Sequence, residues 1–172
     1  IKDEGAIAIC KSLRRNKSLQ ELNLGRNGIA SDGANALKAA LSERSAVLKI
    51  VLNRNSIGDE GASALGEALK NKTLKELGLM QCRIGPDGGK ALAAALSEGS
   101  AVLTKLVLTV NQIKDEGAIA LGEALKTNKT LKELDLFHCG IGPEGGKALA
   151  AALSEGSAVL TSLDLKYNTL AA

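Results

Sequence analysis

Hydrophobic and polar residues alternate in a short segment that recurs along the chain. In Glu21-Leu22-Asn23-Leu24, the alternation places Leu22 and Leu24 on one face and Glu21 and Asn23 on the other. A period of two residues is typical of a short strand with one buried face. The sequence therefore predicts six short strands, centred near Leu22, Ile50, Leu77, Leu106, Leu134 and Leu163.

A second hydrophobic pattern, with helical spacing, follows each predicted strand. After the turn Gly58-Asp59-Glu60-Gly61, the apolar residues Ala62, Leu65 and Leu69 lie on one face of a helix. Acidic residues and proline are both favourable in the first turn of a helix, so we expect the acidic residues there to cap the helix that they begin. The predicted helices begin near Asp3, Ser31, Asp59, Pro86, Asp115 and Pro143.

These strand and helix patterns belong to a sequence repeat. The motif reads Leu-x-x-Leu-x-Leu-x-x-Asn/Cys-x-Ile/Leu, and successive copies are 28, 27, 29, 28 and 29 residues apart. Neither a three-residue strand nor its helix can bury an apolar face alone, so the copies must stack with parallel strands inside and helices outside. The residues that end the motif are Asn27, Asn55, Cys82, Asn111, Cys139 and Asn168.

A longer period of 57 residues lies over the first, because the segment that contains Lys90 recurs almost unchanged around Lys147. The alternation of two repeat types resembles ribonuclease inhibitor and the leucine-rich regions of NOD-like receptors. The resemblance implies an α/β leucine-rich-repeat solenoid, or horseshoe, with six parallel strands on the concave side and helices on the convex side. We expect residues 1–172 to form a single domain that is a fragment or part of a longer repeat array.

The residues that end the motif are expected to form a structural ladder. An Asn amide can pair with backbone groups that the loop leaves without partners, and unpaired buried backbone groups are costly. Cys82 and Cys139 are expected to do this less completely, and buried cysteines are usually inert. His138 adjoins Cys139, but its side chain should point to the opposite face.

Composition and charge narrow the classes of partner. The net charge is +3 and lysines alternate with acidic residues, which indicates no nucleic-acid partner. The sequence has no apolar run of about eighteen residues, so we expect no direct insertion into a membrane. Three cysteines cannot form a closed disulfide framework, which favours a cytoplasmic location. The chain begins at Ile1, so an upstream targeting segment stays open. Three Asn-x-Ser/Thr segments, which begin at Asn16, Asn71 and Asn128, recur with the repeat and are interpreted as repeat consensus.

Motifs for catalysis or cofactor binding are incomplete in this sequence. The segment Gly85 to Lys90 has neither the spacing nor the hydroxyl residue of a phosphate-binding loop, since Ala91 follows the lysine. With one histidine in the chain, a catalytic triad or a multi-histidine zinc site lacks components. We therefore expect no enzyme activity, no cofactor and no metal site.

The rare residue types gather at the positions that alternate with the buried leucines. Phe137 and Tyr167 are the only Phe, Tyr or Trp residues, and such residues are favoured at binding hot spots. The charges on these positions form a gradient, near +2 on the first two strands and near −2 on the last two, which does not favour capture of a strongly basic ribonuclease. The predicted partner-binding residues are Met80, Asp135, Phe137, His138, Asp164, Lys166 and Tyr167.

Three functions compete at this stage. The first is a module that binds a protein partner on its concave face, either alone or as part of a larger regulator. The second is an architectural subunit that is held permanently in a large assembly and uses both faces. Whichever function applies, the open edge of the strand at Leu163 predicts neighbouring repeats or another subunit there. The third is activation of a GTPase, implied by resemblance to the activator of Ran, for which Arg83 would be the loop arginine.

Overall fold

Six helices alternate with six strands in a computed structural model that describes residues 1–41, 45–99, 101–155 and 159–170. The helices are α1 (Lys2–Leu13), α2 (Ser31–Leu41), α3 (Gly58–Leu69), α4 (Pro86–Ser97), α5 (Lys114–Thr127) and α6 (Pro143–Ser154). The strands are β1 (Glu21–Asn23), β2 (Lys49–Val51), β3 (Glu76–Gly78), β4 (Lys105–Val107), β5 (Glu133–Asp135) and β6 (Ser162–Asp164). Each repeat therefore contributes one helix and one strand.

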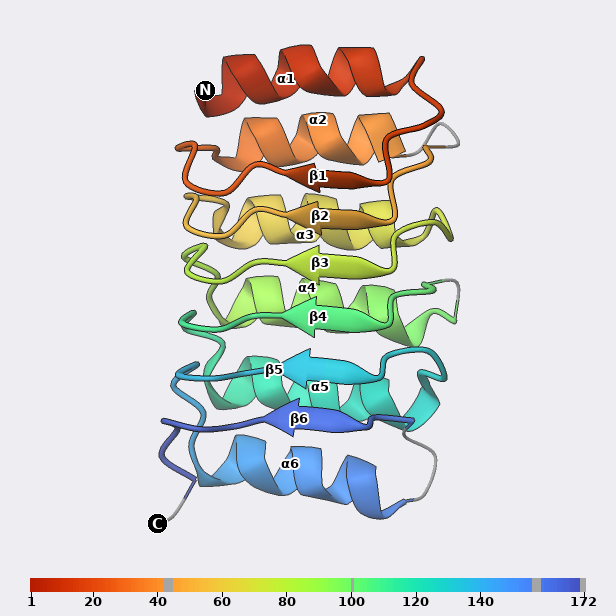
Figure 1. Cartoon of the computed structure of the whole chain (residues 1–172). Helices are drawn as coiled ribbons and strands as arrows, with labels where there is room; N and C mark the ends of the chain where they lie inside the picture. The colour runs from red at the N-terminus through yellow and green to blue at the C-terminus, as the bar shows by residue number, and fades with distance from the viewer. Residues whose placement is uncertain (42–44, 100, 156–158, 171–172) are drawn as a thin grey trace.

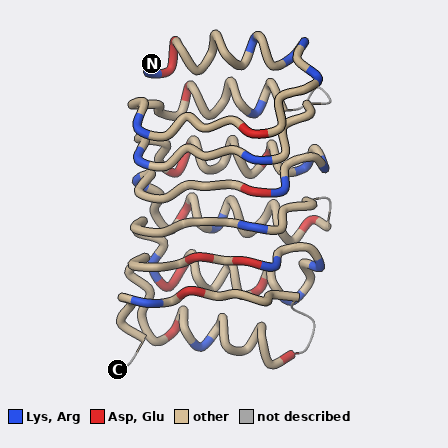
Figure 2. The backbone as a smooth tube through the Cα atoms, viewed as in Figure 1, with Lys and Arg blue, Asp and Glu red and all other residues tan. Residues whose placement is uncertain are grey.

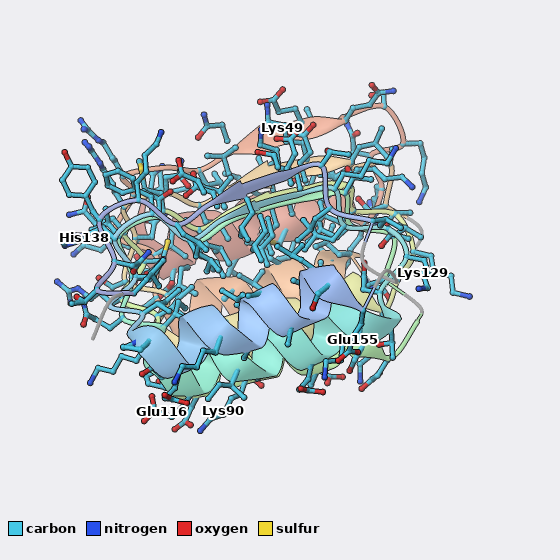
Figure 3. All side chains as sticks on the ribbon, turned by 90° about the horizontal axis from the view of Figure 1, so that it is seen from below. Lys49, Lys90, Glu116, Lys129, His138 and Glu155 are labelled. Atoms are coloured by element: carbon cyan, nitrogen blue, oxygen red, sulfur yellow. The ribbon has the colours of Figure 1, made fainter. Side chains whose placement is uncertain are left out.

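The strands form one parallel sheet in sequence order, and the helices form a second layer behind it (Figure 1). Neighbouring strands pair without any shift of register, so that Leu22 lies beside Ile50 and Ile50 beside Leu77. The two-layer arrangement is also clear along the stack, where the strands lie above the helices (Figure 3). The predicted leucine-rich-repeat solenoid, with six parallel strands and outer helices, is confirmed.

The core is a continuous column between the two layers. The central residue of each inner strand is fully buried, as Ile50 and Leu106 show with no exposed surface. Each repeat adds a thin layer of Leu, Ile and Ala, so no large aromatic ring is needed to fill the space. At the last strand, Leu163 and Leu165 are only partly buried.

Acidic residues at helix starts cap a different helix from the one expected. The Asp115 carboxylate lies in the first turn of α5, where none of its oxygens forms a cap bond to α5. Its Oδ1 instead accepts the N–H groups of Gly142 at 2.7 Å and Gly145 at 2.9 Å, at the start of α6. The expectation of capping within one helix was wrong, because the stacking of repeats places N–H groups at the start of the next helix within hydrogen-bond distance of this carboxylate.

This bond between repeats needs glycine on the receiving helix. A Cβ atom added at Gly145 would lie 2.7 Å from Asp115 Oδ1. Asp3 accepts the N–H groups of Ala30 and Gly33 at the start of α2. Asp59 accepts the N–H group of Gly85, just before α4. Among the described residues, these aspartates lie on the odd-numbered helices and the segments at the start of the even-numbered helices receive their bonds. The structural unit is therefore a pair of repeats, in agreement with the 57-residue period.

Candidate protein-binding surface

The turns that end the strands are held by buried amides. Asn111 is 2% exposed, and its Oδ1 accepts the N–H groups of Cys82 and Ile84, both at 3.0 Å. Its Nδ2 donates to the carbonyl oxygens of Leu79 at 2.8 Å and Leu108 at 2.7 Å. One side chain therefore pairs with four backbone groups from two successive repeats.

The same pattern recurs at Asn55 and Asn168, and it is weaker at Asn27. Asn55 makes four equivalent bonds, three to the preceding repeat and one to the Leu52 carbonyl oxygen of its own repeat. Asn27, in the first complete motif, is half-buried and donates to the carbonyl oxygen of Gly25 at 3.0 Å. The ladder is thus complete where a preceding motif is present, as at Asn168 in the last repeat.

Cysteines occupy the alternate rungs of the ladder. The Cys82 thiol donates to the carbonyl oxygen of Leu52 at 3.2 Å, and the Cys139 thiol donates to that of Leu108 at 3.1 Å. Burial raises the pKa of the Cys82 thiol to about 11 and that of Cys139 to about 12. Both thiols therefore stay protonated near neutral pH, which suits a hydrogen-bond donor and disfavours a nucleophile or a metal ligand.

Beyond each strand the chain makes a turn in which one residue has a left-handed backbone. The sequence pattern predicts that this residue belongs to the strand. Each strand is only three residues long, however, so the residue lies in the turn. Its side chain is exposed or nearly so, and none of the six is glycine or asparagine. These residues, which we call the turn row, are Arg26, Arg54, Gln81, Val110, His138 and Tyr167.

An aromatic cluster lies at one end of the turn row. The ring centroids of Phe137 and Tyr167 are 4.9 Å apart with an angle of 49° between the planes, and those of Phe137 and His138 are 6.4 Å apart. Tyr167 is 76% exposed, and Phe137 is half-buried. In Figure 3, His138 marks the edge of the solenoid on which these turns lie. The structure thus brings together three of the residues singled out from the sequence.

Acidic side chains border this cluster on the strands. Asp135 and Asp164 are register partners on β5 and β6. One oxygen of each shapes its own turn, because it accepts the N–H group of Phe137 in one case and of Lys166 in the other, both at 2.9 Å. The Lys166 ammonium lies 3.7 Å from the second oxygen of Asp164. Asp135 and Asp164 therefore have a structural role that accounts for part of their charge.

Met80 lies apart from the aromatic cluster. It lines a shallow hollow together with residues of β1, β2 and the turns that follow them. The hollow has a volume of about 380 Å³, and both arginines of the turn row, Arg26 and Arg54, border it. The partner-binding residues predicted from the sequence therefore lie in two separate regions along the edge formed by the turns.

Charges at the start of the strands pair with one another. Glu and Lys alternate in register from β1 to β5. The Lys49 ammonium lies 3.1 Å from Glu21, and the Lys105 ammonium lies 2.6 Å from Glu133. The side-chain hydrogen bond to Glu133 raises the pKa of Lys105. Most of the charge in this row of three glutamates and two lysines cancels, so the charge gradient along the concave face comes mainly from residues nearer the turns (Figure 2).

A second hollow, in the middle of the concave face, was missed by sequence reasoning. It measures about 170 Å³, lies over β2 to β4, and exists because Gly78 has no side chain where register partners have Val51 and Val107. A glycine at a position that otherwise carries a side chain was the signal available in the sequence.

One segment of glycosylation type has a structural explanation. Asn128 is 4% exposed, donates to the carbonyl oxygen of Leu96 at 2.9 Å, and accepts the N–H groups of Thr130 and Leu131. A glycan on this amide would break the bond to Leu96.

Among the described residues, no helix is long and apolar enough to cross a membrane. No group of three potential metal ligands occurs in that same part of the chain.

Comparison with known proteins assigns the fold family. The family model described as Leucine Rich repeat matches residues 15–38, 47–66, 70–93, 99–122 and 127–150, which is more than half of the chain. The chain belongs to this family. The matched segments include five of the six strands and five of the six helices, at least in part.

Similar proteins have several different activities. Mouse ribonuclease inhibitor is 30% identical over 164 residues, which cover 94% of this chain and 36% of that protein. Mouse NACHT, LRR and PYD domains-containing protein 14 is 38% identical over 102 residues, or 59% of this chain and 10% of that protein. Frog Ran GTPase-activating protein 1 (Xenopus laevis) is 42% identical over 78 residues, or 40% and 13%. The matched part is thus about a third or less of each relative.

A solved structure confirms the fold by its shape. The actin-binding site 2 of leiomodin-1 superposes with a TM-score of 0.72, at 22% identity, over 88% of this chain and 87% of that one. Likeness at this level of identity shows the fold alone.

Proposed function

We propose that the chain is a protein-interaction module whose partner contacts the concave face near its C-terminal end. The observation that carries the proposal is the contact between the tilted rings of Phe137 and Tyr167, with centroids 4.9 Å apart and Tyr167 76% exposed. Membership of the leucine-rich-repeat family supports protein binding in general, and no relative specifies the partner.

The chemistry of the cluster suits a binding hot spot. Two rings on adjacent turns present rigid apolar surface that loses little side-chain entropy on binding. His138 lies beside them, and Asp135, Asp164 and Lys166 form a polar border. Packing within the chain needs neither ring, since the core consists of Leu, Ile and Ala layers. A partner that covers the rings therefore gains apolar contact, while the polar border selects its orientation.

The test is a double substitution, Phe137→Ala with Tyr167→Ala. A partner is first identified by affinity purification and mass spectrometry, and its affinity is then measured by calorimetry. We expect the double variant to weaken binding by at least about 2 kcal/mol, or roughly 30-fold in Kd, with unfolding unchanged.

A matched control removes apolar surface from the convex side. Ile119→Ala with Leu153→Ala truncates two exposed side chains on α5 and α6, which are 40% and 45% exposed. Unchanged affinity in this control, together with loss in the aromatic variant, supports the proposed site. Equal affinity of the aromatic variant and the unsubstituted chain would move the site to the helices or loops.

Two other functions remain as alternatives. GTPase activation is favoured by the 42% identity to the frog activator and by the exposed, left-handed Arg83 in the loop after β3. Stimulated GTP hydrolysis by the purified chain, lost in Arg83→Ala, would establish it. An architectural subunit would instead copurify with a stoichiometric partner that covers both faces.

For the interaction module we propose a cytoplasmic location. The three cysteines are free thiols, which suits a reducing compartment.

A further inference from the structure

We infer that Arg26 and Arg54 form a second binding site, which takes the carboxylates of an acidic segment, rich in glutamate, of a protein partner. The site lies at the opposite end of the turn row from the aromatic cluster. It does not depend on the function proposed above, because it uses different residues and a different chemistry.

The two guanidinium groups carry charge that the chain itself leaves uncompensated. Arg26 and Arg54 are both exposed, and neither takes part in an ion pair within the described residues. The acidic residues on β1 and β3, Glu21 and Glu76, lie at the far end of the strands and are paired with Lys49. Unpaired cations on neighbouring turns repel each other, and an anion between them removes that repulsion.

The backbone places the two arginines side by side. The N–H group of Arg26 donates to the carbonyl oxygen of Asn53 at 2.9 Å, which joins the two turns directly. The φ angles of Arg26 and Arg54 are 57° and 60°. Left-handed backbone is uncommon for residues other than glycine and asparagine, so an arginine at this position is not explained by local conformation. Both side chains therefore project from equivalent, anchored points.

The hollow beside them favours a glutamate side chain over a phosphate. Apolar atoms of Val51 and Met80 line it, and the methylene groups of a glutamate can pack against them. Phosphate sites commonly use free backbone N–H groups. Here the N–H groups of Gly25 and Met80 already donate to Asn23 Oδ1 and Asn53 Oδ1.

Gly25 lines the hollow at a place where a side chain would have little room. At Gly25 an added Cβ would lie 3.2 Å from the carbonyl oxygen of Asn53 and 3.3 Å from Asn23 Oδ1. The hollow of about 380 Å³ is open to solvent along the turns, so an extended segment can lie across it. Arginine binds carboxylates through two parallel N–H bonds, which fixes orientation as well as charge.

The test is a titration of the isotopically labelled chain with a hexaglutamate peptide, in which binding is measured by NMR. We expect the side-chain Nε–H signals of Arg26 and Arg54 to shift with a Kd on the order of 1 mM or tighter, and the affinity to fall at high salt. Arg26→Gln with Arg54→Gln should weaken binding by about tenfold or more. The control, Lys11→Gln with Arg15→Gln, removes one cation from the last turn of α1 and one just after that helix, and should leave the affinity within about twofold.

Three results would overturn the inference. The first is the absence of saturable shifts at Arg26 and Arg54 with peptide at about 5 mM, well above the expected Kd. The second is an equal loss of affinity in the control variant, which would indicate attraction by net charge alone. The third is tighter binding of inorganic phosphate than of the peptide by the same two arginines, which would assign the site to phosphoryl groups. None of these results bears on partner binding by Phe137 and Tyr167.

Discussion

The two ends of the turn row share a backbone and differ in chemistry. Arg54 and His138 both follow a strand, both have left-handed φ angles, and both donate their N–H group to the next turn. One end presents two arginines without an ion pair beside an open hollow, and the other presents two tilted rings in contact, beside two aspartates. The comparison shows that the ladder beneath fixes the turn, which leaves the exposed side chain free to vary with the partner.

If the turns at the two ends of the turn row rest on the same scaffold, equivalent ladder residues should contribute equally to stability. Substitutions in the ladder should have the largest effect and therefore test this most strongly. Asn111→Ala removes the bonds to two buried N–H groups and to the Leu79 carbonyl oxygen, and it leaves the Leu108 carbonyl oxygen with the Cys139 thiol as its donor. We expect a loss of about 3 kcal/mol in the free energy of unfolding, measured by denaturant titration. Asn55 lies beneath the arginine end of the turn row. Asn55→Ala should lower the free energy of unfolding by the same amount, within about 0.5 kcal/mol.

The control for this prediction is Asn27→Ala. Because Asn27 is half-buried and has no preceding rung, its loss should cost less than about 1 kcal/mol. A neutral Asn111→Ala, or a cost at Asn27 as large as that at Asn111, would contradict the ladder argument.

A smaller effect is expected from the caps between repeats. Asp115→Ala removes the acceptor of two N–H groups at the start of α6 and should cost about 1–2 kcal/mol of stability. Asp3→Ala, which breaks the same bonds at the start of α2, should cost a similar amount. Thermal unfolding of the two variants gives the comparison.

Glu116→Ala is the matched control, since Glu116 is the exposed neighbour of Asp115 and should change stability by less than about 0.5 kcal/mol. If Glu116→Ala and Asp115→Ala were equally destabilising, general helix-dipole effects would replace the specific bond as the explanation.

The smallest effect should come from the turn row itself. Phe137→Ala with Tyr167→Ala, and Arg26→Gln with Arg54→Gln, replace side chains that the core does not need. Each double variant should unfold within about 0.5 kcal/mol per substitution of the unsubstituted chain. Destabilisation of the aromatic variant by more than about 2 kcal/mol would indicate that the rings are a structural cap, and the two ends would then differ in role as well as in chemistry.

The repeat pattern by itself determined the architecture of this protein. Alternation around Leu22 and its equivalents fixed the strands, because a period of two cannot bury leucines in any other regular structure. Helical spacing after each turn fixed the helices, and the constant interval fixed their stacking. The sequence also selected Phe137 and Tyr167, since rare residue types stand out against a uniform repeat.

Only the tertiary structure decided which residues meet across repeats. Asp115 caps the helix of the following repeat, Met80 lies with the arginines and not with the rings, and Lys49 is neutralised by the acidic residues on both neighbouring strands. Sequence patterns report periodicity within one repeat, whereas these contacts depend on the distance and rotation between neighbouring repeats. Those quantities come from packing, in which the small layers of Leu, Ala and Gly set how closely the backbones approach.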